Sequence, residues 1–76
     1  MNKTTKRETR AEKQTRTRAE LIATAATVFA QRGYEGSSVE EIAEQAGYSH
    51  GAVYSNFAGK SDLFLAVFEE YMADRA

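Results

Sequence analysis

The stretch that decides the fold is SVEEIAEQAGYSHGAVYSN, residues 38–56. Apolar residues at helical spacing in its first half predict a short helix of about two turns that ends at Gly47. Ser49 can cap a second short helix, which we expect to run to about Asn56. Two short helices joined by a tight, glycine-containing turn are typical of a helix-turn-helix, although an ordinary pair of bundle helices has the same outline.

The start of the first short helix is indicated by serine. Ser38 with Glu41 three residues later predicts a capping box, and Ser37 with Glu40 is the alternative register. Between the two helices, Gly47 can adopt the positive φ that a tight turn favours. The pair should have an apolar inner side, with core positions at Ile42, Ala46, Tyr48 and Val53.

Two further helices flank the pair. Apolar residues spaced by about four, from Leu21 to Phe29, predict an amphipathic helix that starts near Arg16 and ends at Arg32-Gly33. A last helix should begin near Gly59-Lys60. Its expected buried side chains are Leu63, Phe64, Val67, Phe68 and Tyr71. Because strand signals and proline are absent from the sequence, we predict an all-α fold of four helices.

Charge is distributed unevenly along the chain, although the net charge is only −1. Residues 1–18 carry seven basic and two acidic residues, whereas residues 19–76 carry three and nine. Apolar periodicity is lacking in the first fifteen residues, so we predict a flexible basic arm over 1–15 and a folded domain over 16–76. A basic arm on an acidic body is typical of nucleic-acid contact, and a solvated tail that aids solubility is the alternative.

Composition excludes several classes of protein. With no cysteine and a single histidine, His50, we expect no disulfide, metal or cofactor site. We also expect no enzyme, because no serine, histidine and acid arrangement suggests nucleophilic catalysis. The longest uncharged apolar run, residues 63–68, is too short to span a bilayer, and no secretory signal is present. These features favour a soluble cytoplasmic protein without a membrane partner.

The second short helix has an unusual composition for a bundle helix. Around one apolar anchor, Val53, it presents neutral or weakly polar residues: Ser49, His50, Gly51, Tyr54, Ser55 and Asn56. Such side chains hydrogen-bond phosphates and base edges. Residues 47–60 also contain no acidic residue, and an acid there would repel phosphate. The composition therefore favours a recognition helix at about 49–56, in which small Gly51 allows close approach to DNA.

Several motifs then occur in a fixed order: FAQRGY at 29–34, Ser38 with Ile42-Ala43, AGYS at 46–49, GAVY at 51–54, FAGK at 57–60, and Leu63. Over about residues 16–72 this order and spacing resemble the N-terminal domain of TetR-type bacterial transcriptional regulators. The resemblance implies a three-helix, homeodomain-like helix-turn-helix bundle plus the start of a fourth, connecting helix. It further implies a regulator, usually a repressor, that binds a palindromic operator in double-stranded DNA as a homodimer.

The resemblance also assigns roles to individual positions. The start of the recognition helix, at Ser49, His50 and Gly51, would face the major groove. The other positions implied to contact phosphate or bases are Ser38, Tyr54, Ser55, Asn56 and Lys60. The family more often has an aromatic residue or histidine at position 56, so the role of asparagine there is the least defined. From charge, we expect Arg16, Arg18 and the basic arm before them to add salt-sensitive attraction to DNA.

The larger C-terminal domain of the family, which carries the small-molecule inducer pocket and the dimer interface, has no counterpart in these 76 residues. We therefore expect this chain alone to be monomeric or weakly associating, and the homodimer to form in the longer protein. The resemblance implies a bacterial, nucleoid-associated location. A small helical protein-interaction module without DNA binding is the alternative function.

Overall fold

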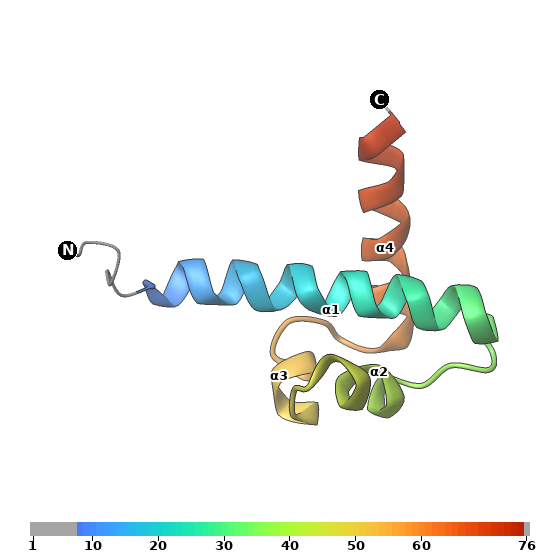
Figure 1. Ribbon diagram of the computed structural model, residues 1–76, viewed down its shortest axis with the longest axis horizontal. Coiled ribbons are helices and arrows are strands. Elements are labelled where there is room, and N and C mark those ends of the chain that lie inside the picture. Colours follow the sequence, from blue (N-terminus) through green and yellow to red (C-terminus); the bar gives the residue numbers. More distant parts are fainter. Residues whose placement is uncertain (1–7, 76) are drawn as a thin grey trace.

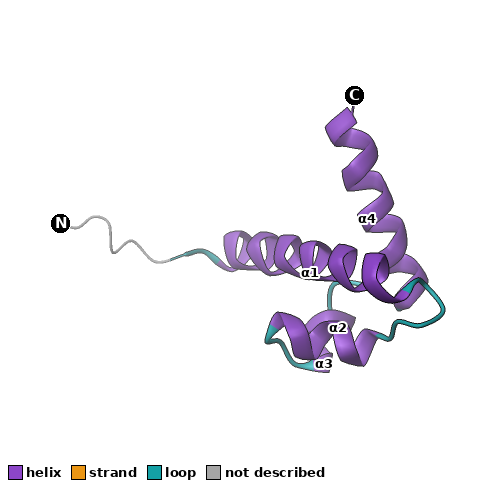
Figure 2. Ribbon diagram, turned by 45° about the vertical axis from the view of Figure 1, so that its right-hand side comes forward, coloured by secondary structure: helices purple, strands orange, loops and turns teal. Residues whose placement is uncertain are grey.

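The computed structural model describes residues 8–75, with side chains to residue 73, and consists of four helices joined by tight turns (Figure 1). The helices are α1 (Arg10–Arg32), α2 (Val39–Ala46), α3 (His50–Tyr54) and α4 (Lys60–Arg75). The short helices α2 and α3 lie together on one side of the long helix α1, and the C-terminal half of α4 projects from the other side (Figures 1 and 2). No residue between 8 and 75 is in a strand, and the all-α prediction is confirmed.

The core lies where α1 packs against α2 and α4, and α3 joins it by packing against α2. The largest fully buried side chains are Phe57, Leu21, Ile42, Leu63, Val28 and Val53, so every helix and the segment after α3 contribute to it. Tyr34 folds back from the end of α1 and stacks on Phe29, with ring centroids 5.8 Å apart. The core thus fixes α2 against α1, and α3 joins it mainly through Val53.

The N-terminal boundary of α1 differs from the prediction. The helix begins at Arg10, so the predicted start near Arg16 is wrong and residues 10–15 of the predicted arm are helical. The cause is a capping box: the Thr9 amide donates to the Glu12 carboxylate at 2.9 Å, and the Glu12 amide donates to the Thr9 hydroxyl at 3.0 Å. These bonds satisfy the N-terminal amides of a polar helical turn without any apolar stripe. Residues 1–7 of the predicted arm lie outside the described residues.

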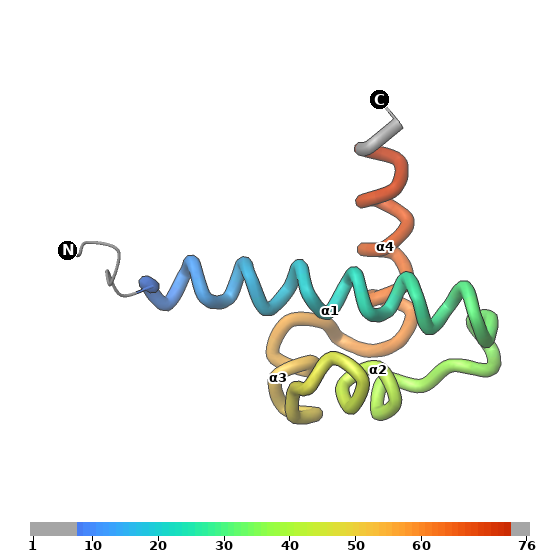
Figure 3. The backbone as a smooth tube through the Cα atoms, in the orientation of Figure 1, coloured from blue at the N-terminus to red at the C-terminus, as the bar shows by residue number. Residues whose placement is uncertain are grey.

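The α2–turn–α3 unit follows the predicted outline closely. Ser38 is the N-cap of α2, and its hydroxyl accepts from the Glu41 amide at 3.1 Å. The Glu41 carboxylate does not complete a capping box, because it pairs with Arg32 at 2.6 Å. Gly47 has φ 81° and ψ 27°, the left-handed conformation expected at the turn. Figure 3 shows the backbone passing from α2 into α3 on the same side of α1. α3 ends at Tyr54, two residues before the predicted end.

One face of α4 is more exposed than predicted. Leu63 and Val67 are buried, but Phe68 is 54% exposed and Tyr71 is 57% exposed. Phe64 is partly exposed and packs edge-on against Phe29 and Tyr34. The burial predicted for Phe64, Phe68 and Tyr71 is therefore wrong, because no described element packs over this face. An apolar groove of about 400 Å³ remains between α1 and α4.

We expect Gly36→Ala to lower the free energy of unfolding by about 1–3 kcal/mol. A Cβ at this position would collide with the backbone carbonyl oxygen of Arg32 and force the α1–α2 turn to shift. Urea denaturation followed by circular dichroism measures the change. Gly59→Ala is the matched control, because a Cβ there meets no atom within 4 Å. An equal loss of stability in the two variants would contradict the steric explanation.

Candidate nucleic-acid interface

Helix α3 is anchored at one residue and exposed at most of the others. Val53 is the buried residue of the helix. The cap residue Ser49 accepts from the Ala52 amide at 3.1 Å, which fixes the first turn. Exposed residues on and around the helix are Ser49, His50, Gly51, Tyr54 and Ser55, and Tyr54 is 49% exposed. The structure thus brings five of the predicted recognition residues to one solvent-facing element.

Asn56 lies at the C-terminal end of this element and is half-buried. Its side-chain amide donates to the Ala52 carbonyl at 2.9 Å, and its carbonyl oxygen accepts from Gln14 at 3.4 Å. Ser55 also donates to the Ala52 carbonyl, at 2.9 Å. Both side chains thus bind the Ala52 carbonyl, which a continuing α-helix would use for the Asn56 amide, and this favours the end of the helix at Tyr54.

Arg18 connects α1 to the end of α3. Its guanidinium donates to the backbone carbonyl of Asn56 at 3.1 Å and lies 4.5 Å from the centroid of the buried Phe57 ring. This combination of a hydrogen bond and a cation–π contact fixes the segment that follows α3. Arg18 is exposed and remains beside the predicted interface, but part of its donor capacity is used within the protein.

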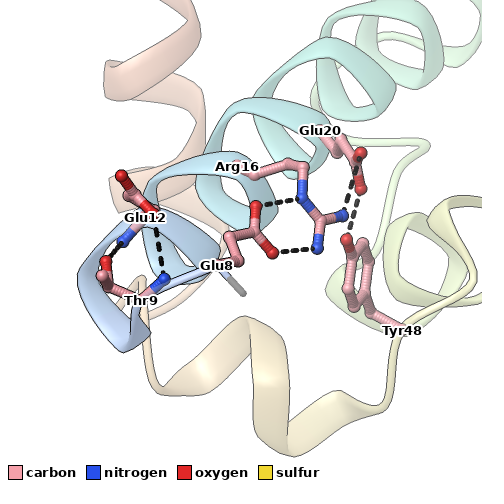
Figure 4. Close-up of polar contacts among 6 residues, drawn as sticks. All are labelled: Glu8, Thr9, Glu12, Arg16, Glu20 and Tyr48. Carbon is pink, nitrogen blue, oxygen red and sulfur yellow. Dashed lines mark hydrogen bonds and ion pairs between the residues drawn. The ribbon is translucent and has the colours of Figure 1, made fainter. Parts of the chain in front are cut away.

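Arg16 lies in a separate ion-pair network on α1 (Figure 4). Its guanidinium binds the Glu8 carboxylate through two hydrogen bonds of 2.8 Å and lies 3.6 Å from Glu20. Hydrogen bonding to Arg16 lowers the pKa of Glu8 below its ordinary value, and the same bonds raise the pKa of Arg16. The positive charge predicted to attract DNA is thus compensated by two carboxylates.

We expect the Glu8 carboxyl to titrate below its ordinary pKa of 4.5. Because the pKa is lower in the folded state, the ion pair stabilises the N-terminal end of α1 above about pH 4.5. That contribution is lost as the pH falls through the folded-state pKa. Carboxyl carbon shifts followed by NMR during an acid titration measure it, and Arg16→Gln should return the pKa of Glu8 towards 4.5. An unchanged Glu8 titration in that variant would contradict the assigned cause.

Ser38 and Lys60 come together away from α3, at the turn between α1 and α2. The Lys60 ammonium donates to the backbone carbonyls of Tyr34 and Ser37, at 2.8 and 2.9 Å, and lies 4.4 Å from the Tyr34 ring centroid. The half-buried Lys60 side chain therefore holds the turn that precedes the Ser38 cap. An ammonium has three donors, so two can bind these carbonyls while one is left for the predicted phosphate contact.

Two cations of the predicted basic arm, Arg10 and Lys13, lie on α1 beside α3. Arg10, Lys13 and Gln14 of α1 line a groove of about 210 Å³ whose other side includes Ala52 and Ser55. No salt bridge of Arg10 or Lys13 occurs among the described residues. The Thr-X-X-Glu capping box at residues 9–12 explains why these two cations lie on a helix rather than in a flexible arm.

Over the described residues, no three histidine, cysteine or acidic side chains are grouped as metal ligands. Likewise, none of the four helices combines the length and the apolar character that crossing a membrane requires.

Comparison with known proteins identifies the family. A family profile described as bacterial regulatory proteins, tetR family, matches residues 21–67. The HTH-type transcriptional repressor AcnR of Corynebacterium glutamicum is 40% identical over 65 residues, which are 86% of this chain and 35% of the relative. The HTH-type transcriptional activator FasR of Mycolicibacterium smegmatis is 38% identical over 55 residues, which are 72% of this chain and 25% of the relative.

The HTH-type transcriptional regulator CymR of Pseudomonas putida is 41% identical over 64 residues, 84% of this chain and 32% of the relative. The chain thus spans about a quarter to a third of the length of these relatives. No solved structure gives a significant match. The matched residues include the α2–turn–α3 unit and its supporting helices, and the chain therefore belongs to the tetR family of bacterial regulatory proteins.

Proposed function

We propose that this chain binds double-stranded DNA sequence-specifically, with α3 in the major groove. The observation that carries the proposal is the surface of α3, which buries Val53 and exposes Ser49, His50, Gly51, Tyr54 and Ser55. Residues 47–60 contain no carboxylate side chain that would repel a phosphate. A short helix with small polar side chains at its exposed start fits the geometry of helix-turn-helix recognition. As a member of this family, the chain is a regulatory protein and not an enzyme.

We assign base contacts to the start of the helix and phosphate contacts to its surroundings. Ser49 and His50 can hydrogen-bond base edges, and Gly51 lets the backbone approach them. The phosphate contacts are assigned to Ser38, Tyr54, Ser55, Asn56 and Lys60. Lys60 and Asn56 already hold protein groups, so we propose that each contacts DNA with its remaining hydrogen-bonding capacity.

The electrostatic attraction is assigned chiefly to Arg10, Lys13 and Arg18. Arg10 and Lys13 line the groove beside α3, and Arg18 binds the backbone at its end. Arg16 contributes less, because Glu8 and Glu20 compensate its charge. Each phosphate neutralised by a cation adds about 0.9 to the slope of log affinity against log salt concentration.

We therefore expect Lys13→Gln to lower this salt slope by about 1, and Arg16→Gln to lower it by less than half as much. Fluorescence anisotropy with a labelled random-sequence duplex between about 50 and 200 mM salt measures the slopes. Gln31→Ala, an exposed change at the opposite end of α1, is the control and should leave the slope unaltered. Equal effects of the two cation substitutions would contradict the charge compensation of Arg16.

The longer protein is proposed to be a homodimeric repressor in the bacterial cytoplasm, at the nucleoid. Relatives named as repressors and one named as an activator support a regulator, and repression of a palindromic operator is the commonest mode that the family resemblance implies. An inducer would bind a further domain, since the relatives are about three to four times longer than the matched region. No cofactor or membrane partner is included in the proposal.

Selection of bound sequences from a random duplex library tests the proposed function. The 76-residue chain should enrich a defined half-site and bind it more tightly than random duplex, with both affinities falling as salt rises. A single half-site lacks the gain of two linked contacts, so the absolute affinity should be modest. Failure to enrich any sequence, with no salt-dependent binding, would favour a protein-interaction module instead.

A further inference from the structure

Helix α3 has few direct packing contacts with α1, yet α1 is the element on which the rest of the domain is built. Its core anchor is the single residue Val53. At its C-terminal end, the Gln14–Asn56 and Arg18–Asn56 hydrogen bonds join it to α1. These hydrogen bonds hold the C-terminal end of α3. The N-terminal end, where the base contacts are proposed, must be oriented by other contacts.

The residue that precedes this end is Tyr48, and it is held in three ways. Its backbone amide donates to the Ala43 carbonyl at 2.9 Å, and its half-buried ring packs against the core. Its hydroxyl donates to the carboxylate of Glu20 on α1, 28 residues earlier in the chain (Figure 4). The last contact is the long-range one, and it joins the α2–α3 turn to α1.

Glu20 is in turn held from the N-terminal side. Its second carboxylate oxygen lies 3.6 Å from Arg16, whose remaining donors bind Glu8. Figure 4 shows Glu8, Arg16, Glu20 and Tyr48 as a continuous chain of contacts along α1 to the turn. A carboxylate fixed by a neighbouring cation loses rotamer freedom and becomes a more directional acceptor.

We propose that Tyr48 and Glu20 are positioning residues for sequence discrimination: their hydrogen bond fixes where Ser49 and His50 enter the major groove. Neither side chain itself needs to touch DNA. Ser49 follows Tyr48 directly, so a displacement of the turn moves the cap and the first turn of α3 together. Discrimination between bases depends on bidentate geometry, whereas attraction to phosphates tolerates small displacements. This inference rests on the proposed function.

The test compares the sequence preference of variants with their general DNA affinity. Tyr48→Phe removes the hydroxyl and keeps the ring, so the ratio of affinities for the selected half-site and random duplex should fall about three- to tenfold. Affinity for random duplex should stay within about twofold, because the cationic surface is unchanged. The thermal midpoint should change little, because the ring remains in its place.

Four further variants make the test specific. Glu20→Ala should lower the ratio as Tyr48→Phe does, and the double variant should lower it no further, since both remove the same bond. Glu20→Gln keeps an acceptor and should restore part of the ratio. Tyr71→Phe removes an exposed hydroxyl on α4 and should have no effect.

The outcomes separate this inference from the proposed function. If the wild-type chain selects no sequence, the proposed function and the inference both fall. If it selects one and Tyr48→Phe keeps the full ratio, only the positioning role is overturned. Equal losses on half-site and random duplex would also overturn it, since Tyr48 would then contact phosphate directly. Additive effects of Tyr48→Phe and Glu20→Ala on the affinity ratio would overturn the positioning role as well.

Discussion

Gly51→Leu is expected to reduce affinity for the selected half-site by about 10- to 100-fold without reducing the stability of the fold. Gly51 is exposed in the first turn of α3, and a Cβ there would meet only the Ser49 hydroxyl, at 3.8 Å. The protein alone thus has room for a side chain at this position. Replacing glycine in a helix even contributes up to about 1 kcal/mol to stability.

The expected loss of affinity comes from the bound state. A leucine would hold the start of α3 away from the groove and weaken the base contacts proposed for Ser49 and His50. Each good base contact is worth about 1–3 kcal/mol, and 1.4 kcal/mol corresponds to a factor of ten. Under the proposed mode of binding, the glycine at position 51 allows the backbone to approach DNA, whereas the space around it in the folded protein does not require a glycine.

Anisotropy titrations of the half-site and thermal unfolding by circular dichroism together measure the two effects. Ala23→Leu is the matched control, because it adds a similar bulk at an exposed position of α1 that faces α4 rather than α3. Ala23→Leu should leave the affinity for the selected half-site within about twofold of the wild-type value. A Gly51→Leu variant that binds as tightly as the wild type would remove α3 from the proposed interface.

The parts of the structure that could be predicted from the sequence depend on neighbouring residues. The cap at Ser38, the left-handed Gly47 and the cap at Ser49 are signals within a few residues, and each is present where it was predicted. The buried positions Ile42 and Val53 follow from periodicity alone. Capping residues, the turn glycine and apolar periodicity therefore suffice to predict the helix-turn-helix without any tertiary contact.

The parts that could not be predicted depend on residues far apart in the chain. The sequence predicts DNA contacts for Arg16 and Lys60 but not their partners within the protein: Arg16 pairs with two carboxylates, and Lys60 binds two backbone carbonyls 23 and 26 residues away. Sequence spacing does not show which partner a long flexible side chain will find. The Tyr48–Glu20 hydrogen bond, which spans 28 residues, was missed for the same reason.

Phe57→Ala is expected to cost about 3–5 kcal/mol, which is comparable with the whole stability of a domain of this size. Phe57 is 2% exposed, lies in the segment between α3 and α4, and packs against the Arg18 guanidinium. The variant should therefore lose its cooperative urea transition and its DNA binding together. Phe68→Ala is the control: Phe68 is 54% exposed, and its loss should cost less than about 1 kcal/mol. A Phe57→Ala variant that stays folded and still binds DNA would show that α3 is held chiefly by its polar contacts with α1. A variant that stays folded but does not bind DNA would show that Phe57 positions α3 rather than stabilising the core.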